Sequence, residues 1–174
     1  TDFVRPKVRD FAGGSIYFKI TSEETRDLKA LALENGTTLY TLLLSLFNVF
    51  LAKLTGQETI VVGTAVAGRR HTDLQQIIGM FVNTLVLVHF PGNQRNFKEF
   101  LQEVNQGTQE AFENQDYPFE ELVEKLGIAR DTGRNPLFDV MFDLQPIAME
   151  EIEIPGLKLE PYRHDAKISK FDLM

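Results

Sequence analysis

The chain has 174 residues, which is within the range of about 100–200 residues expected for one domain. Its net charge of −7 argues against a sequence-independent nucleic-acid binder and against docking on an anionic membrane, since both need a basic surface. The absence of cysteine excludes disulfides, thiolate nucleophiles and zinc–thiolate sites. No apolar run reaches the roughly 18 residues of a membrane-spanning helix and no signal peptide is evident, so a cytoplasmic location is expected.

The first third of the chain predicts one strand and two helices. Apolar and polar side chains alternate over residues 16–20, which predicts a half-buried strand. Thr21 and Glu24 have the spacing of a capping box, so a helix is expected to begin there and to end at Gly36. Residues 38–55 predict a second helix, and because it is apolar on most sides we expect it to be buried.

Two strands and a helix are predicted next. Residues 59–67 form a short β-branched run that is typical of a strand covered on both faces. Residues 81–90 predict another buried strand, which the polar pair Asn83 and Thr84 interrupts. If buried, this pair needs hydrogen-bond partners, since an unpaired polar group costs about 1–3 kcal/mol. Residues 97–114 place their apolar side chains on one face of a helix.

The last part of the chain predicts a short helix followed by strands. Pro118 opens the helix and Gly127 ends it. Alternation predicts a strand over residues 138–144, a Pro-Gly turn predicts a hairpin over 152–162, and a final strand begins at 168–174. Helices and strands do not alternate strictly, which indicates a mixed α/β arrangement of the α+β kind and not a doubly wound sheet.

Side chains that could carry catalysis form no recognisable motif. None of His71, His89 and His164 belongs to a His-Glu-x-x-His metal motif, and the sequence has neither a Gly-x-Ser-x-Gly elbow nor a phosphate-binding loop. We therefore expect histidines on the surface or in loops and no metal site, while a Ser–His–Asp triad assembled by the fold stays open. Glu120 and Glu121 are expected to stabilise the start of a helix.

Three segments combine polar, aromatic and proline residues. Residues 79–84 read Gly-Met-Phe-Val-Asn-Thr, residues 114–120 read Asn-Gln-Asp-Tyr-Pro-Phe-Glu, and residues 130–137 read Arg-Asp-Thr-Gly-Arg-Asn-Pro-Leu. Turn and capping chemistry accounts for each of them singly. In their order and approximate spacing, however, they resemble three core motifs of the condensation domains of nonribosomal peptide synthetases. The resemblance covers nearly all of the chain.

The resemblance implies a fold like that of chloramphenicol acetyltransferase, with two similar halves in a V and an active site in the tunnel between them. Whole domains of this family join an acyl or peptidyl thioester to the amine of an aminoacyl thioester, both carried on phosphopantetheine arms of carrier proteins. The family's catalytic signature, His-His-x-x-x-Asp-Gly, belongs to the first half and does not occur in this sequence. Residues 1–174 are therefore expected to be a partial C-terminal subdomain that has no catalytic residue, binds no cofactor directly and is inactive alone.

By the same resemblance, this chain would supply the acceptor-side wall of the tunnel. Its partners would be the N-terminal half of the domain, the acceptor and donor carrier proteins and a neighbouring adenylation domain, in a pathway of antibiotic biosynthesis. Arg134 could equally form a structural ion pair with Asp131. The side chains expected to shape the tunnel wall or the contact between halves are Asn83, Thr84, Gln115, Asp116, Tyr117, Arg134 and Asn135.

Two positions depart from the family pattern, and two other functions stay open. Gly133 stands where a serine is more common, and Val88 and His89 stand where relatives commonly place an arginine. The chain could instead be an inactive condensation-like module that recruits another protein, or a standalone acyltransferase of the same fold. If the chain is a piece of a longer domain, apolar surface normally covered by the other half should be exposed and should favour self-association.

Overall fold

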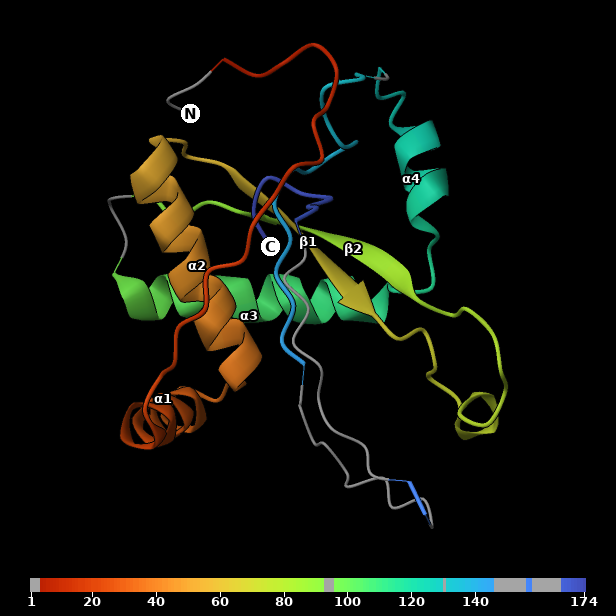
Figure 1. The fold of residues 1–174 in the computed structure, drawn as a ribbon. Coiled ribbons are helices and arrows are strands. Elements are labelled where there is room, and N and C mark those ends of the chain that lie inside the picture. Colours follow the sequence, from red (N-terminus) through yellow and green to blue (C-terminus); the bar gives the residue numbers. More distant parts are fainter. Residues whose placement is uncertain (1–3, 93–95, 130, 146–155, 158–166) are drawn as a thin grey trace.

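The computed structural model describes residues 4–92, 96–129, 131–145, 156–157 and 167–174. From α1 to α4 the helices and the two strands of a small sheet follow one another in the order that the sequence predicts (Figure 1). The elements are α1 (Ser22–Glu34), α2 (Leu39–Thr55), β1 (Ile60–Val66), the 3-10 turn η1 (Thr72–Leu74), β2 (Asn83–His89), α3 (Phe97–Glu113) and α4 (Phe119–Lys125).

The predicted helix boundaries are confirmed, together with the interactions that set them. The Thr21 side chain accepts a hydrogen bond from the backbone N–H of Glu24 at 3.2 Å, and the Glu24 carboxylate accepts one from the backbone N–H of Thr21 at 2.9 Å. These bonds from Thr21 favour the ionised form of Glu24 and lower its pKa. The helix α2 ends at Gly56, whose φ of +68° suits a residue without a Cβ.

The sheet consists of β1 and β2, which pair in an antiparallel sense from Ile60 opposite His89 to Val66 opposite Asn83. Residues 140–142 lie on the other side of β1. The backbone N–H of Gly63 donates to the carbonyl oxygen of Val140 at 2.9 Å, in a parallel sense. The strands predicted over 138–144 and 168–174 therefore appear as short bridged segments alongside the sheet.

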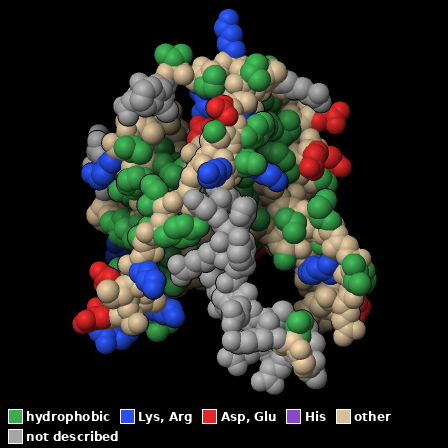
Figure 2. All heavy atoms as spheres, in the orientation of Figure 1, with side chains coloured by type: hydrophobic (Ala, Val, Ile, Leu, Met, Phe, Trp, Pro, Cys, Tyr) green, Lys and Arg blue, Asp and Glu red, His purple; other side chains and the backbone are tan. Residues whose placement is uncertain are grey.

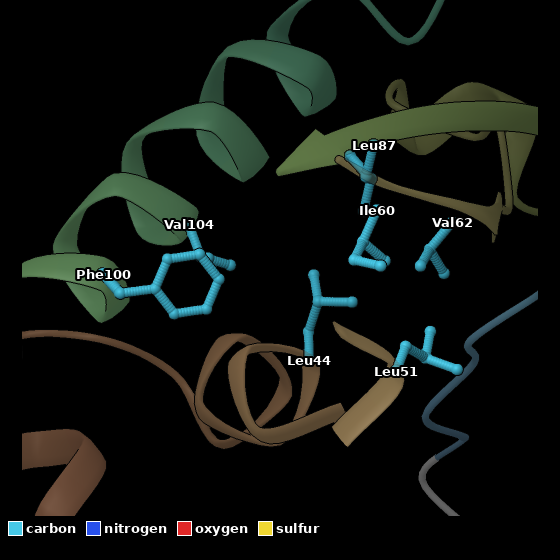
Figure 3. Packing of buried hydrophobic residues seen from close by; sticks show 7 residues of the cluster. All are labelled: Leu44, Leu51, Ile60, Val62, Leu87, Phe100 and Val104. Atoms are coloured by element: carbon cyan, nitrogen blue, oxygen red, sulfur yellow. The ribbon is translucent and has the colours of Figure 1, made fainter. Parts of the chain in front are cut away.

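The core lies between the sheet and the helices α2 and α3 (Figure 3). Leu44, Val62 and Val104 come from three different elements and are completely buried. Burial of such side chains contributes about 1.5–3 kcal/mol each, which makes this cluster the main source of stability. The members of the cluster are Leu44, Leu51, Ile60, Val62, Leu87, Phe100 and Val104.

The prediction of a strand over residues 16–20 is wrong. The segment is not paired with any described strand, and Ile16, Tyr17 and Phe18 are 92%, 82% and 82% exposed. Alternation gives a strand one apolar face, but the strand forms only where a neighbour accepts its backbone hydrogen bonds. Within the described part of the chain, no such neighbour lies beside this segment.

The expectation of a surface histidine is wrong for His89 and right for His71, which is exposed. His89 ends β2 and is only 2% exposed, with its ring edge-on to Phe100 at 6.5 Å between centroids. Burial lowers the pKa of His89 to about 4, because the charged imidazolium would lose its hydration. His164 and the hairpin predicted over 152–162 fall on residues that lie wholly or mostly outside the described ranges.

Within the described ranges, none of the helices could cross a membrane alone by length and composition. The pair α1 and α2 would pass such a test together, but the two helices meet at an angle of 100°. Three leucines of α2 are buried inside the protein, which accounts for its apolar character.

Candidate functional site

Five of the seven predicted residues meet at one corner of the fold, where β2 begins and the chain turns from α3 into α4. We call Asn83, Thr84, Gln115, Asp116 and Tyr117 the corner cluster. The Asn83 amide donates to the carbonyl oxygens of Gln115 at 2.7 Å and Tyr117 at 2.8 Å. Its oxygen accepts from the backbone N–H groups of Thr84 at 2.9 Å and Phe119 at 3.2 Å. The Asn83 side chain in an apolar strand thus has the hydrogen-bond partners it needs.

The other side chains of the corner cluster divide into inward and outward groups. The Gln115 amide donates to the carbonyl oxygen of Phe112 at 2.7 Å and so stays within its own turn. Asp116 is 70% exposed and accepts from the guanidinium of Arg70 at 2.9 Å. Tyr117 is 41% exposed. Asp116 and Tyr117 are therefore the members available to a partner or substrate.

The remaining two predicted residues lie in a second group, which joins the N-terminal segment to the last described segment. We call Arg5, Arg9, Arg134, Asn135, Asp139 and Asp172 the arginine cluster. Arg5 donates to the carbonyl oxygen of Gly133 at 3.2 Å and forms ion pairs with Asp172 and, at 3.4 Å, with Asp139. The hydrogen bond to Asp172, together with the nearby carboxylates, raises the pKa of Arg5 above its ordinary value.

Within the arginine cluster, Asn135 is held on both sides. Its oxygen accepts from the Arg9 guanidinium and its amide nitrogen donates to the carbonyl oxygen of Lys170 at 3.0 Å. Arg134 is 56% exposed, and its nearest carboxylate is that of Asp139 at 3.7 Å. Among the described residues its ion-pair partner is thus Asp139 and not Asp131. Asn135 acts as a structural link, whereas Arg134 keeps most of its hydrogen-bonding capacity.

The glycine at position 133 follows from how closely the N-terminal segment crosses this loop. A Cβ at Gly133 would lie 2.7 Å from the carbonyl oxygen of Pro6, which is closer than real Cβ contacts. The side chain of Thr132 donates to the carbonyl oxygen of Lys7 at 2.7 Å, so the crossing is fixed by hydrogen bonds. A serine at position 133 would force the two segments apart, which gives this departure from the family pattern a physical reason.

A row of aromatic rings connects the two clusters. The backbone N–H of Phe119 donates to the Asn83 side-chain oxygen, and the centroid of the Phe119 ring lies 5.7 Å from that of Phe138. The Phe138 ring in turn stacks on Phe171, with 5.7 Å between the ring centroids. A Cβ at Gly63 would lie 2.2 Å from the Phe138 ring, so β1 leaves space for that ring only because it has no side chain there. Beside this row is an open groove of about 1180 Å³ between α4 and residues 127–139.

The sequence reasoning missed the residue that shapes the loop between β1 and β2. The Arg69 guanidinium donates to the carbonyl oxygens of Leu74, of Ile77 at 2.8 Å and of Gly79 at 3.0 Å. It also lies 4.3 Å above the centroid of the Phe81 ring. The only signal in the sequence was an arginine pair in a polar loop, which does not reveal which carbonyl groups it will bind.

The loop that Arg69 organises presents apolar side chains to solvent. Ile78 and Met80 are almost fully exposed, and Val82 is 61% exposed. At the start of the loop, Gly68 has a φ of +64°, and a Cβ there would lie 1.9 Å from the Phe81 carbonyl oxygen. The loop extends away from the helices and the sheet (Figure 1). Its exposed apolar residues are therefore held out by a fixed backbone.

The described side chains suit binding and positioning better than bond-making chemistry. Within the described ranges, no group of three or more His, Asp or Glu side chains could hold a metal ion. His89 is buried, and its Nδ1 has no hydrogen-bond partner there. The exposed polar groups of the two clusters are instead a carboxylate, a phenol and a guanidinium on a rigid scaffold.

Comparison with known proteins identifies the family. The model of the condensation domain family matches residues 1–174. The chain belongs to the condensation domain family. It is 53% identical over 174 residues to Gramicidin S synthase 2 of Brevibacillus brevis, covering 99% of this chain and 4% of that protein. It is 51% identical over 173 residues to Tyrocidine synthase 3 of Brevibacillus parabrevis, covering 99% and 3%. The chain thus spans only a few per cent of these relatives.

Solved structures confirm the fold expected for this condensation domain, which is like that of chloramphenicol acetyltransferase. A four-domain nonribosomal peptide synthetase bound to AMP and glycine aligns with a TM-score of 0.82 and 29% identity, over 86% of this chain and 11% of that one. The complex of the X-domain and OxyB from teicoplanin biosynthesis aligns with a TM-score of 0.73 and 22% identity, over 80% and 31%. At 22% identity, the similarity to the X-domain complex is evidence for the fold alone.

Proposed function

We propose that this chain is the partial C-terminal half of a peptide-bond-forming condensation domain in a nonribosomal peptide synthetase. The domain would join a donor acyl or peptidyl thioester to an acceptor aminoacyl thioester, each on the phosphopantetheine arm of a carrier protein. The match of the family model over the whole chain carries this proposal. The absence of His-His-x-x-x-Asp-Gly from the sequence supports a piece that is inactive by itself.

The chain would contribute the acceptor-side wall of the active-site tunnel. Two large thioesters must be aligned before they react, so much of the rate acceleration comes from positioning. The exposed side chains of Asp116, Tyr117 and Arg134 are the groups that such a wall offers to the acceptor. Asn83 and Asn135 would hold their loops in place, as a supporting shell does in a preorganised site.

Exposed apolar surface supports a missing partner half. Ile16, Ile78 and Met80 are each more than 90% exposed, and on the face drawn in Figure 2 further hydrophobic side chains lie uncovered among charged ones. Monomeric proteins seldom leave so many large apolar side chains in water. The N-terminal half of the domain would cover part of this surface, and without it the chain would self-associate.

An assay with two loaded carrier proteins tests the proposal. The chain alone and the parent domain that contains both halves are incubated with a donor thioester and an acceptor aminoacyl thioester, and the dipeptide is measured by mass spectrometry. We expect product from the parent domain only. Turnover by the chain alone would show that the catalytic residues lie within it, and a parent domain that binds other proteins but forms no peptide would favour the recruitment module.

Substitution of Arg134 in the parent domain tests the tunnel wall. We expect Arg134→Ala to reduce turnover while the melting temperature stays unchanged, because the side chain is largely exposed and only weakly paired. Lys29→Ala, on an exposed position of α1, is the matched control for loss of one positive charge. Loss of folding in Arg134→Ala would instead assign the residue to the scaffold.

A further inference from the structure

The backbone at Leu137 adopts a conformation that residues with a side chain rarely take. Its φ is +67°, and within the described ranges no other residue except glycine has a positive φ. The backbone N–H of Phe138 donates to the carbonyl oxygen of Pro136 at 2.9 Å, across Leu137. A hydrogen bond between residues two positions apart, around a residue of positive φ, is the rarer and more strained kind of γ-turn. We call residues 136–138 the strained turn.

A leucine gains nothing locally from this conformation. For an L-amino acid, a positive φ brings the Cβ too close to a backbone carbonyl oxygen, whereas glycine has no Cβ and avoids the clash. Five glycines in the described part of the chain adopt a positive φ at no such cost. A strained residue persists only where the surrounding structure determines its conformation, and such residues gather at functional sites. The contacts on either side of Leu137 should therefore hold the turn in place.

Upstream of the strained turn, the chain is tied to the N-terminal segment. The Asn135 side chain accepts from the Arg9 guanidinium and donates to the carbonyl oxygen of Lys170 at 3.0 Å. The backbone N–H of Arg9 donates to the carbonyl oxygen of Thr132 at 3.0 Å. These contacts fix the chain immediately before Pro136.

Downstream of the strained turn, the chain is tied to the sheet. Phe138 is 6% exposed, and its ring occupies the space that Gly63 leaves on β1. The Asp139 carboxylate accepts from the backbone N–H of Asn135 at 3.3 Å and so closes the loop across the turn. A change of φ at Leu137 would have to break the contacts of Asn135 or withdraw the Phe138 ring. The strain is thus maintained from both ends.

The strained turn lies in the wall of the groove between α4 and residues 127–139. Leu137 and Arg134 both line this groove, and Arg134 is 56% exposed. The turn connects the loop that carries Arg134 to the sheet over three residues, so its release would let that loop move relative to β1. We propose that Leu137 is a positioning residue, whose strained turn fixes the backbone that directs Arg134 towards the acceptor thioester. This inference rests on the proposed function, which places Arg134 on the acceptor-side wall.

Glycine and alanine variants of Leu137 separate the backbone strain from the side chain. Both substitutions remove the leucine side chain, but only glycine accepts the positive φ without a clash. We expect the urea midpoint of Leu137→Gly to exceed that of Leu137→Ala by about 0.5 M. Leu126 is the matched control, because its φ is −77°. At that position the glycine variant should unfold at a lower urea concentration than the alanine variant. Alanine as the more stable variant at both positions would overturn the strain at Leu137.

Turnover of the parent domain distinguishes a positioning residue from a purely structural one. We expect Leu137→Gly to lower kcat/KM for the acceptor aminoacyl thioester by about tenfold, because the acceptor is aligned less well, while KM for the donor stays unchanged. Leu137→Ala keeps the strained turn and should retain most of the turnover. The more stable variant would then be the less active one, whereas a purely structural role predicts activity that follows stability.

The other outcomes each decide against one part of the inference. Equal losses of turnover in the glycine and alanine variants would assign the effect to the leucine side chain and not to the backbone. Full turnover in Leu137→Gly would overturn the positioning role. Urea unfolding of the chain needs no turnover, so the strain is tested separately from the proposed function. An unsubstituted parent domain that forms no peptide would refute the proposed function and the positioning role together.

Discussion

Replacing Asn83 by alanine should destabilise the corner between β2, α3 and α4. The substitution removes four hydrogen bonds, three of which join β2 to the turn that contains Gln115, Tyr117 and Phe119. A typical intramolecular hydrogen bond contributes about 1 kcal/mol, so the three tertiary bonds amount to about 3 kcal/mol. Asn83 is only half-buried and water can replace part of this loss. We therefore expect the free energy of unfolding to fall by about 2–3 kcal/mol.

Urea unfolding of the chain, followed by circular dichroism, measures this loss. Asn114→Ala is the matched control, because the Asn114 amide donates only to the Glu110 carbonyl oxygen at 2.8 Å, within its own helix end and exposed to water. That change should cost less than about 1 kcal/mol. Asn83→Asp keeps the acceptor and loses both donors, so it should be nearly as destabilising as the alanine variant.

The reasoning would be refuted if Asn83→Ala and Asn114→Ala unfolded at the same urea concentration. In that case the amide would not hold the corner, and its hydrogen bonds would be replaced by water at no net cost. A stable Asn83→Ala variant whose parent domain has lost turnover would move Asn83 from the scaffold to direct contact with the substrate.

Two further substitutions test the packing of β1 and the burial of β2. Gly63→Ala should lower the free energy of unfolding by about 1–3 kcal/mol in thermal or urea unfolding, because the new Cβ would meet the Phe138 ring. Gly14→Ala is the control and should have little effect, since a Cβ there has open space around it. Equal stability of the two variants would contradict the close contact at Gly63. His89 should make stability depend on pH. Its folded pKa of about 4 lies below the unfolded value of about 6.5, so the unfolded chain binds the extra proton and stability should fall, by up to about 3 kcal/mol, as pH drops from about 6.5 to 4. His89→Phe should flatten that part of the pH profile, and an unchanged slope would assign the loss to other groups.

Local signals in the sequence determined the helices well. The capping box at Thr21 and the glycine at position 56 act within one turn, so the residues that fix those boundaries are adjacent in the sequence. The strand predicted over residues 16–20 failed because pairing depends on a distant partner. His89 was misjudged for the same reason, since its burial depends on the packing of Phe100 from α3.

The candidate site was predictable as a set of segments but not as an arrangement. The motifs indicated that Asn83 and Tyr117 both belong to the site. They did not indicate that the Asn83 amide donates to the backbone carbonyl oxygen of Tyr117. The partners of Asn135 were out of reach, because Arg9 lies 126 positions away in the sequence. Arg9 and Arg5 precede the first element that the sequence predicts, so their roles depend on tertiary structure alone.

The manner in which Arg69 holds its loop bears on how the surface of this chain can change during evolution. The guanidinium binds carbonyl oxygens of the main chain at Leu74, Ile77 and Gly79, and these atoms are the same for every amino acid. Mutations at neighbouring exposed positions such as Ile78 and Met80 can therefore alter what the loop contacts while its path is kept. Related synthetases could diversify this contact one side chain at a time, provided that they retain the arginine.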